Sequence, residues 1–399
     1  MHKYQITKIA FIGFAILFCA NILFSQQNKP NILFIFADDH TYEALSAFGS
    51  EAKTPNLDKL AERGTVFNNA YNMGSYSGAV CIASRTMLNT GRFVWNALDL
   101  EPNMAAERNA GRIWPQYLDK NGYDTYFAGK WHVRNSSPSQ LFANVGTVRP
   151  GMPQDHFDWG NRDVHHIGYD RPAQFQPDEW SPYDSTMGGY WNGGKHWSEV
   201  LADESEGFLQ QAAGKDDPFF MYLAFNAPHD PRQSPKEYVD MYPLDAIAVP
   251  ENFQSLYPHR DEIGCGYALR DARLAPFPRM EYAVKVHRQE YYALITHMDV
   301  QIGRILDALE ATGKADSTWI FFSADHGLSV GERGLLGKQN MYEEAMKAPL
   351  IINGPGVEAG KTIDVPVYIQ DIMATTLELS GEGIPDHVQF KSLLPLLNG

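Results

Sequence analysis

The sequence is poor in cysteine, in basic residues and in long hydrophobic runs. Only three of its 399 residues are cysteine, which is too few for the disulfide framework of a small secreted domain. Lys and Arg number 33 against 48 Asp and Glu, and the net charge of −15 argues against a nucleic-acid partner because an acidic surface repels phosphate groups. Internal repeats and low-complexity segments are also absent from the sequence, which is typical of an ordinary globular protein.

One apolar run, at residues 9–20, is long enough to serve in targeting. It follows a short positive segment with Lys3 and Lys8, and it is too short to span a bilayer comfortably. This pattern predicts a signal peptide at residues 1–25 and an exported protein, periplasmic or extracellular, with no stable membrane span after cleavage. An uncleaved membrane anchor is the alternative. Residues 26–399 are then one large domain.

Continuous apolar runs alternate with amphipathic segments along the chain. Such runs suit buried strands of a mostly parallel sheet, and the segments between them are typical of helices, the longest at about 281–312. This alternation predicts one α/β domain with a central, mostly parallel sheet and helices on both faces, and ligands in such folds bind where strands end. The predicted strands are Asn31–Ala37, Tyr123–Ala128, Pro218–Phe225, Thr318–Ser323 and Leu350–Asn353.

The stretch 134–200 differs from the rest of the chain. It is rich in Pro, Gly, Asn, His and aromatic residues and has little periodicity, which predicts an irregular insert. Four of the eight Trp lie within 151–200, where their rings could stack on sugar rings in a substrate-binding region. A small satellite core beneath a long loop is the competing interpretation. These residues are Trp159, Trp180, Trp191 and Trp197.

Carboxylates and an imidazole stand where two of the predicted strands end. Asp38 and Asp39 follow the first strand, and Asp325 and His326 follow the fourth. Singly, such residues have ordinary explanations, because adjacent aspartates often cap a helix and a lone histidine is usually a packed side chain. Together they would offer a hard cation several oxygen ligands and one imidazole. That set favours Ca²⁺ or Mg²⁺ and leaves a transition metal open.

Two longer segments resemble known signatures. Residues 81–92 read Cys-Ile-Ala-Ser-Arg-Thr-Met-Leu-Asn-Thr-Gly-Arg and resemble the first signature of the formylglycine-dependent (type I) sulfatases. Residues 122–132, which end in Gly-Lys-Trp-His, resemble the second signature. The resemblance runs from about Pro30 to the C-terminal end in the expected order. It implies the alkaline-phosphatase-like α/β fold and a sulfatase catalytic domain over residues 26–399.

The resemblance also implies an activity, the hydrolysis of sulfuric esters. A separate maturation enzyme would oxidise Cys81 to formylglycine, whose hydrate attacks sulfur, displaces the alcohol and then releases sulfate. A divalent cation, Ca²⁺ with Mg²⁺ as the second choice, would lower the pKa of the hydrate. Asp325-His326 and the Ala-Pro-His229 segment are most similar to the iduronate-2-sulfatase-like and choline-sulfatase-like branch, which includes bacterial polysaccharide sulfatases. The expected substrate is therefore a sulfated polysaccharide or oligosaccharide.

The functional residues of the family map onto this chain residue by residue. Arg85 matches the residue that holds the hydrate, and Lys130 and Lys338 match cations that grip the sulfate. His132 matches the residue that helps to eliminate sulfate, and His229 matches a sulfate-side donor or general acid for the alcohol. The implied metal ligands are Asp38, Asp39, Cys81, Asp325 and His326.

Two features depart from the family pattern. Ala83 stands where the core motif usually has proline, and this position bears on recognition by the maturation enzyme. The chain stops at Gly399, just after a Ser-Leu-Leu-Pro-Leu-Leu segment, whereas family members continue into a small C-terminal subdomain. That subdomain is therefore expected to be truncated.

Two other functions stay open on the sequence. A phosphatase or phosphonate hydrolase of the same superfamily would use similar chemistry, although cysteine at the nucleophile position favours a sulfatase. A non-catalytic sulfated-glycan-binding protein is the second alternative, and an unmatured Cys81 or a disulfide between Cys81 and Cys265 would support it. The candidate substrate contacts are Arg162, His165, His166, Trp191 and Arg232.

Overall fold

The computed structural model of the protein describes residues 29–78, 80–155 and 180–398. Within these residues, no helix has the length and apolar character needed to cross a membrane. Several predictions fall outside the described residues: the signal peptide, Trp159, and the substrate contacts Arg162, His165 and His166.

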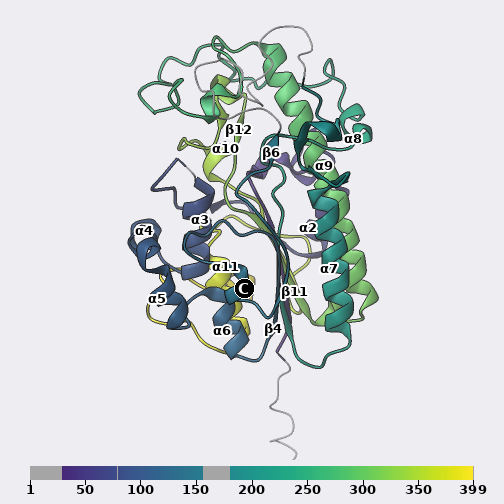
Figure 1. The fold of residues 1–399 in the computed structure, drawn as a ribbon, viewed down its shortest axis with the longest axis vertical. Helices are drawn as coiled ribbons and strands as arrows, with labels where there is room; N and C mark the ends of the chain where they lie inside the picture. The colour runs from purple at the N-terminus through teal and green to yellow at the C-terminus, as the bar shows by residue number, and fades with distance from the viewer. Residues whose placement is uncertain (1–28, 79, 156–179, 399) are drawn as a thin grey trace, which may run out of the picture.

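An eight-stranded sheet forms the centre of the described structure (Figure 1). β14 is the only antiparallel strand of this sheet. It pairs antiparallel with both β11 and β2, and every other pair in the sheet is parallel. The predicted α/β class with a mostly parallel sheet is thus confirmed. The order is β15 (Lys361–Ile363), β2 (Thr65–Phe67), β14 (Leu350–Asn353), β11 (Thr318–Ala324), β1 (Asn31–Ala37), β10 (Phe219–Ala224), β4 (Asp124–Lys130) and β5 (Asn144–Arg149).

Strand β1 lies in the middle of the sheet, between β10 and β11. All seven of its residues are buried. A parallel strand in this place has helices above and below it, so both of its faces must be apolar, and a continuous apolar run results. The same reasoning holds for β10 and β11, which are also buried throughout. All five strands predicted from apolar runs are therefore confirmed.

Helices cover both faces of the sheet, as predicted (Figure 1). On one face α9 packs against α2 and α7, and on the other face α3 packs against α4, α6 and α11. The long helix predicted at 281–312 is α9. The bounds are α2 (Pro55–Arg63), α3 (Val80–Thr90), α4 (Val94–Leu100), α5 (Met104–Asn109), α6 (Trp114–Lys120), α7 (Trp197–Ala213), α9 (Glu281–Ala311) and α11 (Asp371–Leu379).

Short elements connect these layers, mostly beyond the carboxyl ends of the strands. They include four two-stranded ribbons and three short helices. The ribbons are β3 (Ala70–Tyr71) with β16 (Val367–Tyr368), β6 (Gln154–Asp155) with β7 (Gly188–Gly189), β8 (Trp191–Asn192) with β9 (Lys195–His196), and β12 (Ser329–Val330) with β13 (Leu336–Gly337). The helices are α8 (Lys236–Asp240), α10 (Glu343–Met346) and α12 (Leu394–Leu397).

The stretch 134–200 is more regular than its composition predicted. Its described part supplies β5, which pairs parallel with β4 at the edge of the central sheet. β5 is only partly buried, so it lacks the apolar run by which the other strands were recognised. Trp180 packs in a small core with Leu274 and Leu336, which agrees with the satellite-core interpretation for that residue.

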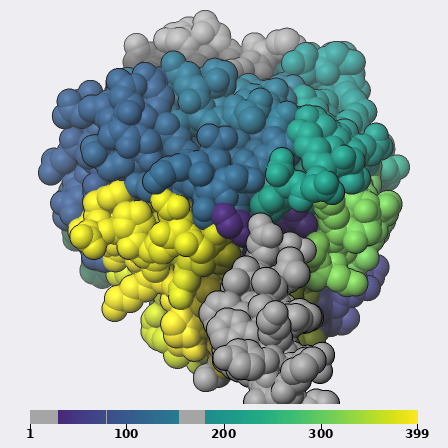
Figure 2. All heavy atoms as spheres, turned by 90° about the horizontal axis from the view of Figure 1, so that it is seen from below, coloured from purple at the N-terminus to yellow at the C-terminus, as the bar shows by residue number. Residues whose placement is uncertain are grey.

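The C-terminal residues pack at the end of the molecule where β1 begins. Viewed from that end, they lie in yellow beside the blue segment that includes α6 (Figure 2). Tyr117 Oη and His387 Nε2 are 2.9 Å apart, and Asn121 Nδ2 donates a hydrogen bond of 2.6 Å to the carbonyl of Ser380. This segment therefore contacts the scaffold at the opposite end from the carboxyl edge of the sheet.

Candidate active site

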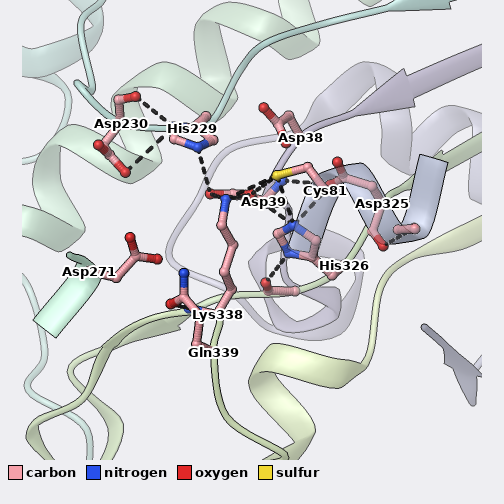
Figure 3. A network of polar contacts seen from close by, with 12 residues as sticks. Asp38, Asp39, Cys81, His229, Asp230, Asp271, Asp325, His326, Lys338 and Gln339 are labelled. Carbon is pink, nitrogen blue, oxygen red and sulfur yellow. Dashed lines mark hydrogen bonds and ion pairs between the residues drawn. The ribbon is translucent and has the colours of Figure 1, made fainter. Parts of the chain in front are cut away.

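The polar residues predicted at the strand ends meet at the carboxyl edge of the sheet (Figure 3). Asp38 and Asp39 follow β1, and Asp325 and His326 follow its parallel neighbour β11. The backbone N–H of Asp39 donates a hydrogen bond of 3.2 Å to Asp325 Oδ1, which joins the two strand ends. Asp39 has a φ of 65°, and such strained backbone in a non-glycine residue concentrates at functional sites.

Cys81 lies in the first turn of α3, and its side chain reaches this group. Its Sγ is 3.2 Å from Lys338 Nζ, 3.4 Å from His326 Nε2 and 3.9 Å from Asp39 Oδ1. Cys81 and Cys265 both have free thiols. The alternative of a disulfide between these two cysteines is therefore wrong. The N-terminal end of a helix favours negative charge, and Cys81 sits at that end.

Two buried lysines balance the negative charges of the two aspartates that follow β1. Lys130, the last residue of β4, forms an ion pair with Asp38. Lys338, which follows β13, lies 2.7 and 2.8 Å from the two carboxylate oxygens of Asp39. Because charged groups are costly to bury alone, each lysine and its aspartate stabilise each other in the buried state.

Arg85 joins three of the elements that build the site. It lies one helical turn after Cys81 on α3, and its side chain is fully buried. Its Nε is 3.0 Å from Asp325 Oδ2, and its guanidinium donates a hydrogen bond of 2.7 Å to the backbone carbonyl of Lys130. The guanidinium carbon also lies 4.8 Å from the ring centre of Phe36 on β1. Arg85 therefore fixes the positions of its neighbours.

The cluster shifts the pKa values of its own members. Burial opposes ionisation of the Cys81 thiol, but the two lysines and His326 outweigh it and hold the pKa of Cys81 well below its ordinary value. Burial also opposes protonation of His326, yet the negative charges of Asp325, Asp39 and Cys81 raise its pKa to about 9. The pKa of Asp38 is raised because it is fully buried and Asp325 is close. The site therefore favours a negative charge at residue 81.

The same residues have the composition of a divalent-cation site. One ligand atom each from Asp38, Asp39, Cys81 and His326 lies within 4.8 Å of the others. Asp325 adds a carboxylate oxygen 3.5 Å from His326 Nε2. Asp38 Oδ1 is buried and accepts no hydrogen bond from the described residues, and its ion-pair contact with Arg85 Nη2 is long, at 4.0 Å, so this oxygen could bind a cation. Carboxylate oxygens are the ligands that Ca²⁺ and Mg²⁺ prefer, and the donor set therefore fits the predicted metal.

His132 follows β4 and faces Cys81. Its φ is 54°, again a left-handed conformation in a non-glycine residue. Burial lowers the pKa of His132 to about 4, so the ring is neutral near pH 7 and can accept a proton. Gly151 lies directly against the ring, and a Cβ atom at this glycine would come within 2.5 Å of His132 Cε1 and Nε2. The ring position therefore depends on the absence of a side chain at Gly151.

His229 lies on the loop after β10, on the side of the cluster away from α3 (Figure 3). Its Nε2 is 3.8 Å from Asp39 Oδ2, and its Nδ1 is 2.6 Å from the backbone carbonyl of Asp230. Tyr190 donates hydrogen bonds of 2.6 and 3.0 Å to the carbonyls of Asn226 and His229. These contacts direct Nε2 of His229 into the cluster.

His40 makes the stability of the protein depend on pH. Its ring is fully buried, and burial lowers its pKa from 6.5 to about 4. Between these values the unfolded chain binds a proton that the folded chain does not, so stability rises with pH across this window. We expect wild-type protein to lose roughly 3 kcal/mol of unfolding free energy relative to His40→Gln as pH falls from 7 to 4. Urea unfolding of both proteins over this range measures the difference, and a pH-independent difference would contradict the expectation.

All the predicted catalytic and metal-binding residues come together in this one cluster. The two described substrate-contact candidates are packed against other side chains instead of facing Cys81. Arg232 is fully buried, with its guanidinium 3.0 Å from His287 Nδ1. Trp191 packs edge-on against His196. One supporting residue was missed: Tyr291, in the middle of α9, donates a hydrogen bond of 2.6 Å to the carbonyl of Asp39. No local motif marks a tyrosine inside a long helix, so the sequence held no signal for it.

The chain is similar to known proteins over most of its length. A family model described as Sulfatase matches residues 30–382. A sulfatase of Formosa agariphila is 30% identical over 400 residues, which cover 93% of this chain and 73% of the relative. The N-acetylglucosamine-6-O-sulfatase of Bacteroides thetaiotaomicron is 25% identical, covering 95% of this chain and 73% of the relative. The iduronate 2-sulfatase of Homo sapiens is 28% identical, and the match covers 94% of this chain and 69% of the relative.

Solved structures share the fold. A protein in complex with its substrate D-glucosamine-2-N,6-O-disulfate has a TM-score of 0.65 at 23% identity, covering 93% of this chain and 81% of that chain. The phosphonate monoester hydrolase of Silicibacter pomeroyi has a TM-score of 0.68 at 22% identity, and the match covers 93% of this chain and 77% of that chain. The expected alkaline-phosphatase-like fold is confirmed, and because one of these structures is a phosphonate monoester hydrolase, the fold by itself leaves the ester class open. The family match over most of the chain decides it: this protein belongs to the sulfatase family, whose members hydrolyse sulfate esters.

Proposed function

We propose that the protein removes sulfate from carbohydrates through a formylglycine residue made from Cys81. The position of Cys81 carries this proposal. Cys81 lies in the first turn of α3, and its buried side chain is within 3.4 Å of Lys338 and His326. A nucleophile in this place faces cations that attract the sulfate and carboxylates that hold a metal, which is the setting that attack on a sulfate ester needs.

The nucleophile would be made after translation. A maturation enzyme breaks one Cβ–H bond and the Cβ–Sγ bond of Cys81, sulfur leaves as hydrogen sulfide, and an oxygen atom from water becomes the carbonyl oxygen on Cβ. The oxidant of that enzyme takes up the two electrons and two protons that are released. Water then adds to the aldehyde and gives a carbon with two hydroxyl groups. Ala83, two residues on, is the position at which this chain departs from the usual motif.

Sulfate transfer is the first half of the proposed reaction. One hydroxyl of the hydrate gives up its proton to water, its oxygen forms a bond to sulfur, and the bond from sulfur to the alcohol oxygen breaks. Lys130 and Lys338 both act electrostatically on residue 81 and would offset charge on the sulfate oxygens. His229, which approaches from the opposite side to α3, would donate a proton to the leaving alcohol oxygen.

Release of sulfate is the second half. The remaining hydroxyl loses its proton, the carbonyl at residue 81 forms again, and the bond between its carbon and the sulfate oxygen breaks. His132 would accept that proton, since its lowered pKa of about 4 keeps the ring neutral at the start of the step. A new water then adds to the aldehyde and restores the hydrate.

Four residues would hold the divalent cation, and we propose Ca²⁺. They are Asp38, Asp39, Asp325 and His326, with the residue made from Cys81 beside them. When bound, such a cation lowers the pKa of an adjacent hydroxyl and neutralises sulfate oxygens. The contact of 3.0 Å from Arg85 Nε keeps Asp325 in its orientation whether or not the cation is present.

A carbohydrate substrate is supported by the relatives rather than by the cluster itself. One relative is an N-acetylglucosamine-6-O-sulfatase, and one solved structure of the same fold holds a glucosamine disulfate. We further propose that residues 1–25 are a signal peptide that directs export of a catalytic domain of residues 26–399. Export would bring the enzyme to sulfated polymers too large to enter the cell.

Mass spectrometry of the tryptic peptide of residues 64–85 tests this function directly. Protein made in a host with the maturation enzyme should carry an aldehyde at residue 81 that a hydrazine probe traps, and it should release sulfate from a panel of sulfated sugars. An unmodified thiol with no sulfate release would refute the proposed mechanism. It would favour the non-catalytic, glycan-binding alternative.

Gly151→Ala tests the role of His132. The added Cβ would meet the His132 ring at 2.5 Å, and the ring must therefore move. We expect kcat to fall by about 10–100-fold, because a displacement of about 1 Å in a catalytic group has an effect of this size. Steady-state kinetics with sulfate release as the readout measures it. The matched control is Gly207→Ala on α7, where no atom lies within 4 Å of the new Cβ, and activity should be unchanged.

A further inference from the structure

A cavity of about 650 Å³ opens beside the catalytic cluster. Three segments line it: residues 74–78 with Val80 at the start of α3, part of the loop 263–269, and residues 338–346 after β13. Lys338 belongs to both places. It lines the cavity, and its Nζ lies 3.2 Å from Cys81 Sγ and 2.7 Å from Asp39 Oδ1. A sulfate held at Cys81 would therefore have its ester oxygen near this cavity.

The walls of the cavity are largely apolar. Among the described residues that line it, Lys338 is the only one with a charged side chain, and both oxygens of Asp39 already contact its ammonium group. The remaining polar lining side chains are uncharged. Two apolar side chains are presented to solvent at the cavity, Met341 at 76% exposure and Ile263 at 38%. The other apolar and aromatic lining residues are Val80, Leu269, Tyr342 and Met346.

We propose that this cavity is the subsite for the alcohol half of the sulfate ester, and that it accepts a ring that carries no charge of its own. The inference rests on the proposed function, since it assumes that sulfate binds at Cys81. Its volume lies in the range of small-molecule sites that bury most of their ligand. Apolar side chains suit the apolar face of a sugar or aromatic ring, and so does the face of the Tyr342 ring that the guanidinium of Arg333, paired with Glu344, does not cover.

A ring with its own carboxylate fits this subsite poorly. Burying an anion against apolar walls removes its water, and the described lining residues hold no uncommitted cation to replace that water. The predicted contacts Trp191 and Arg232 do not line the cavity, so they would not supply one. The subsite therefore selects neutral rings over uronic acids among sulfated sugars.

Binding of two aryl sulfates to the full-length Cys81→Ala protein with Ca²⁺ present tests this proposal. The probes are 4-acetylphenyl sulfate and 4-carboxyphenyl sulfate, which have similar shapes and differ in the charge of the ring. We expect calorimetry to give the neutral ester a Kd at least fivefold lower. Adding Met341→Lys should strengthen binding of the carboxylate ester at least fivefold and leave the neutral ester within twofold. Met341→Glu should weaken binding of the carboxylate ester further.

Val365→Lys is the matched control, because Val365 is also exposed, at 48%, and does not line the cavity. It should change neither Kd. Equal binding of the two esters, or an equal effect of Met341→Lys on both, would overturn the proposal, since a merely structural effect ignores the charge of the ligand. Cys81→Ala needs no maturation, so these outcomes are independent of the aldehyde test. Failure of the proposed function would instead appear as an unmodified thiol in the wild-type peptide.

Discussion

Replacing Cys81 with alanine is expected to lower kcat/KM for sulfate release by roughly 10⁴-fold or more, the scale seen when a covalent nucleophile is removed. Alanine has no Sγ and cannot become an aldehyde, so no hydrate forms at residue 81. The protein should still fold, because alanine suits the first turn of α3 and the ion pairs of Lys338 with Asp39 and Arg85 with Asp325 remain. Sulfate release from matured protein and circular dichroism measure the two effects.

Cys265→Ala is the matched control for this prediction. Cys265 is also buried and free, and its Sγ donates only a long contact of 3.4 Å to the carbonyl of Gln339. We expect this variant to keep its activity and its hydrazine-reactive aldehyde. If Cys81→Ala still released sulfate at a rate near that of the wild type, the nucleophile would have to be another group, and the formylglycine mechanism would be abandoned.

Removing the divalent cation is expected to abolish activity and to lower Tm. A cation present at 100 times its Kd stabilises the folded state by about 2.7 kcal/mol, which corresponds to roughly 3 °C for a chain of this size. The physical reason is that Asp38, Asp39 and Asp325 are buried close together and repel one another, while Asp38 Oδ1 has no hydrogen-bond partner in the described part of the chain. Thermal unfolding with and without a chelator measures the shift.

Asp39→Asn should remove this response to the chelator. The variant keeps the size of the side chain but loses the charge that faces His326 at 3.1 Å and Lys338 at 2.7 Å. Asp371→Asn is the control, because Asp371 is a buried carboxylate that accepts backbone hydrogen bonds from Tyr368 and Lys391, outside the cluster. It should unfold at a lower temperature but keep the shift with chelator. A chelator response that survives in Asp39→Asn would place the cation elsewhere.

Local patterns predicted most of the fold. The apolar runs of β1 and β11 marked buried strands because helices cover both of their faces, and α9 was recognisable from its length and periodicity. The same criterion could not find β5, an edge strand whose residues are partly exposed. Nor could it give the direction of β14, since a strand of four residues, three of them buried, has the same composition in either orientation. Orientation depends on where the connecting chain leads.

The residues of the site also fall into those that the sequence predicted and those that only the structure shows. Its chemistry-bearing residues stand in short motifs or directly after predicted strands, so the sequence alone pointed to Cys81, Asp38 and Asp325. Their partners come from far along the chain. Tyr291 reaches the carbonyl of Asp39 from the middle of α9, and Gly151 lies against His132. Such contacts join residues with no shared motif, and only the packed structure reveals them.

The amino-acid sequence by itself determined the α/β class, the family and the set of residues that meet at the carboxyl edge of the sheet. These follow from local hydrophobic patterns and contiguous motifs, which need no knowledge of distant neighbours. Tertiary structure alone decided that Asp38 Oδ1 accepts no hydrogen bond from the described residues. It also decided that Lys338 both contacts Asp39 and lines the cavity, and that the walls beside Met341 are apolar. Burial, electrostatic coupling and cavity shape arise between segments far apart in sequence, and they exist only once the chain has folded.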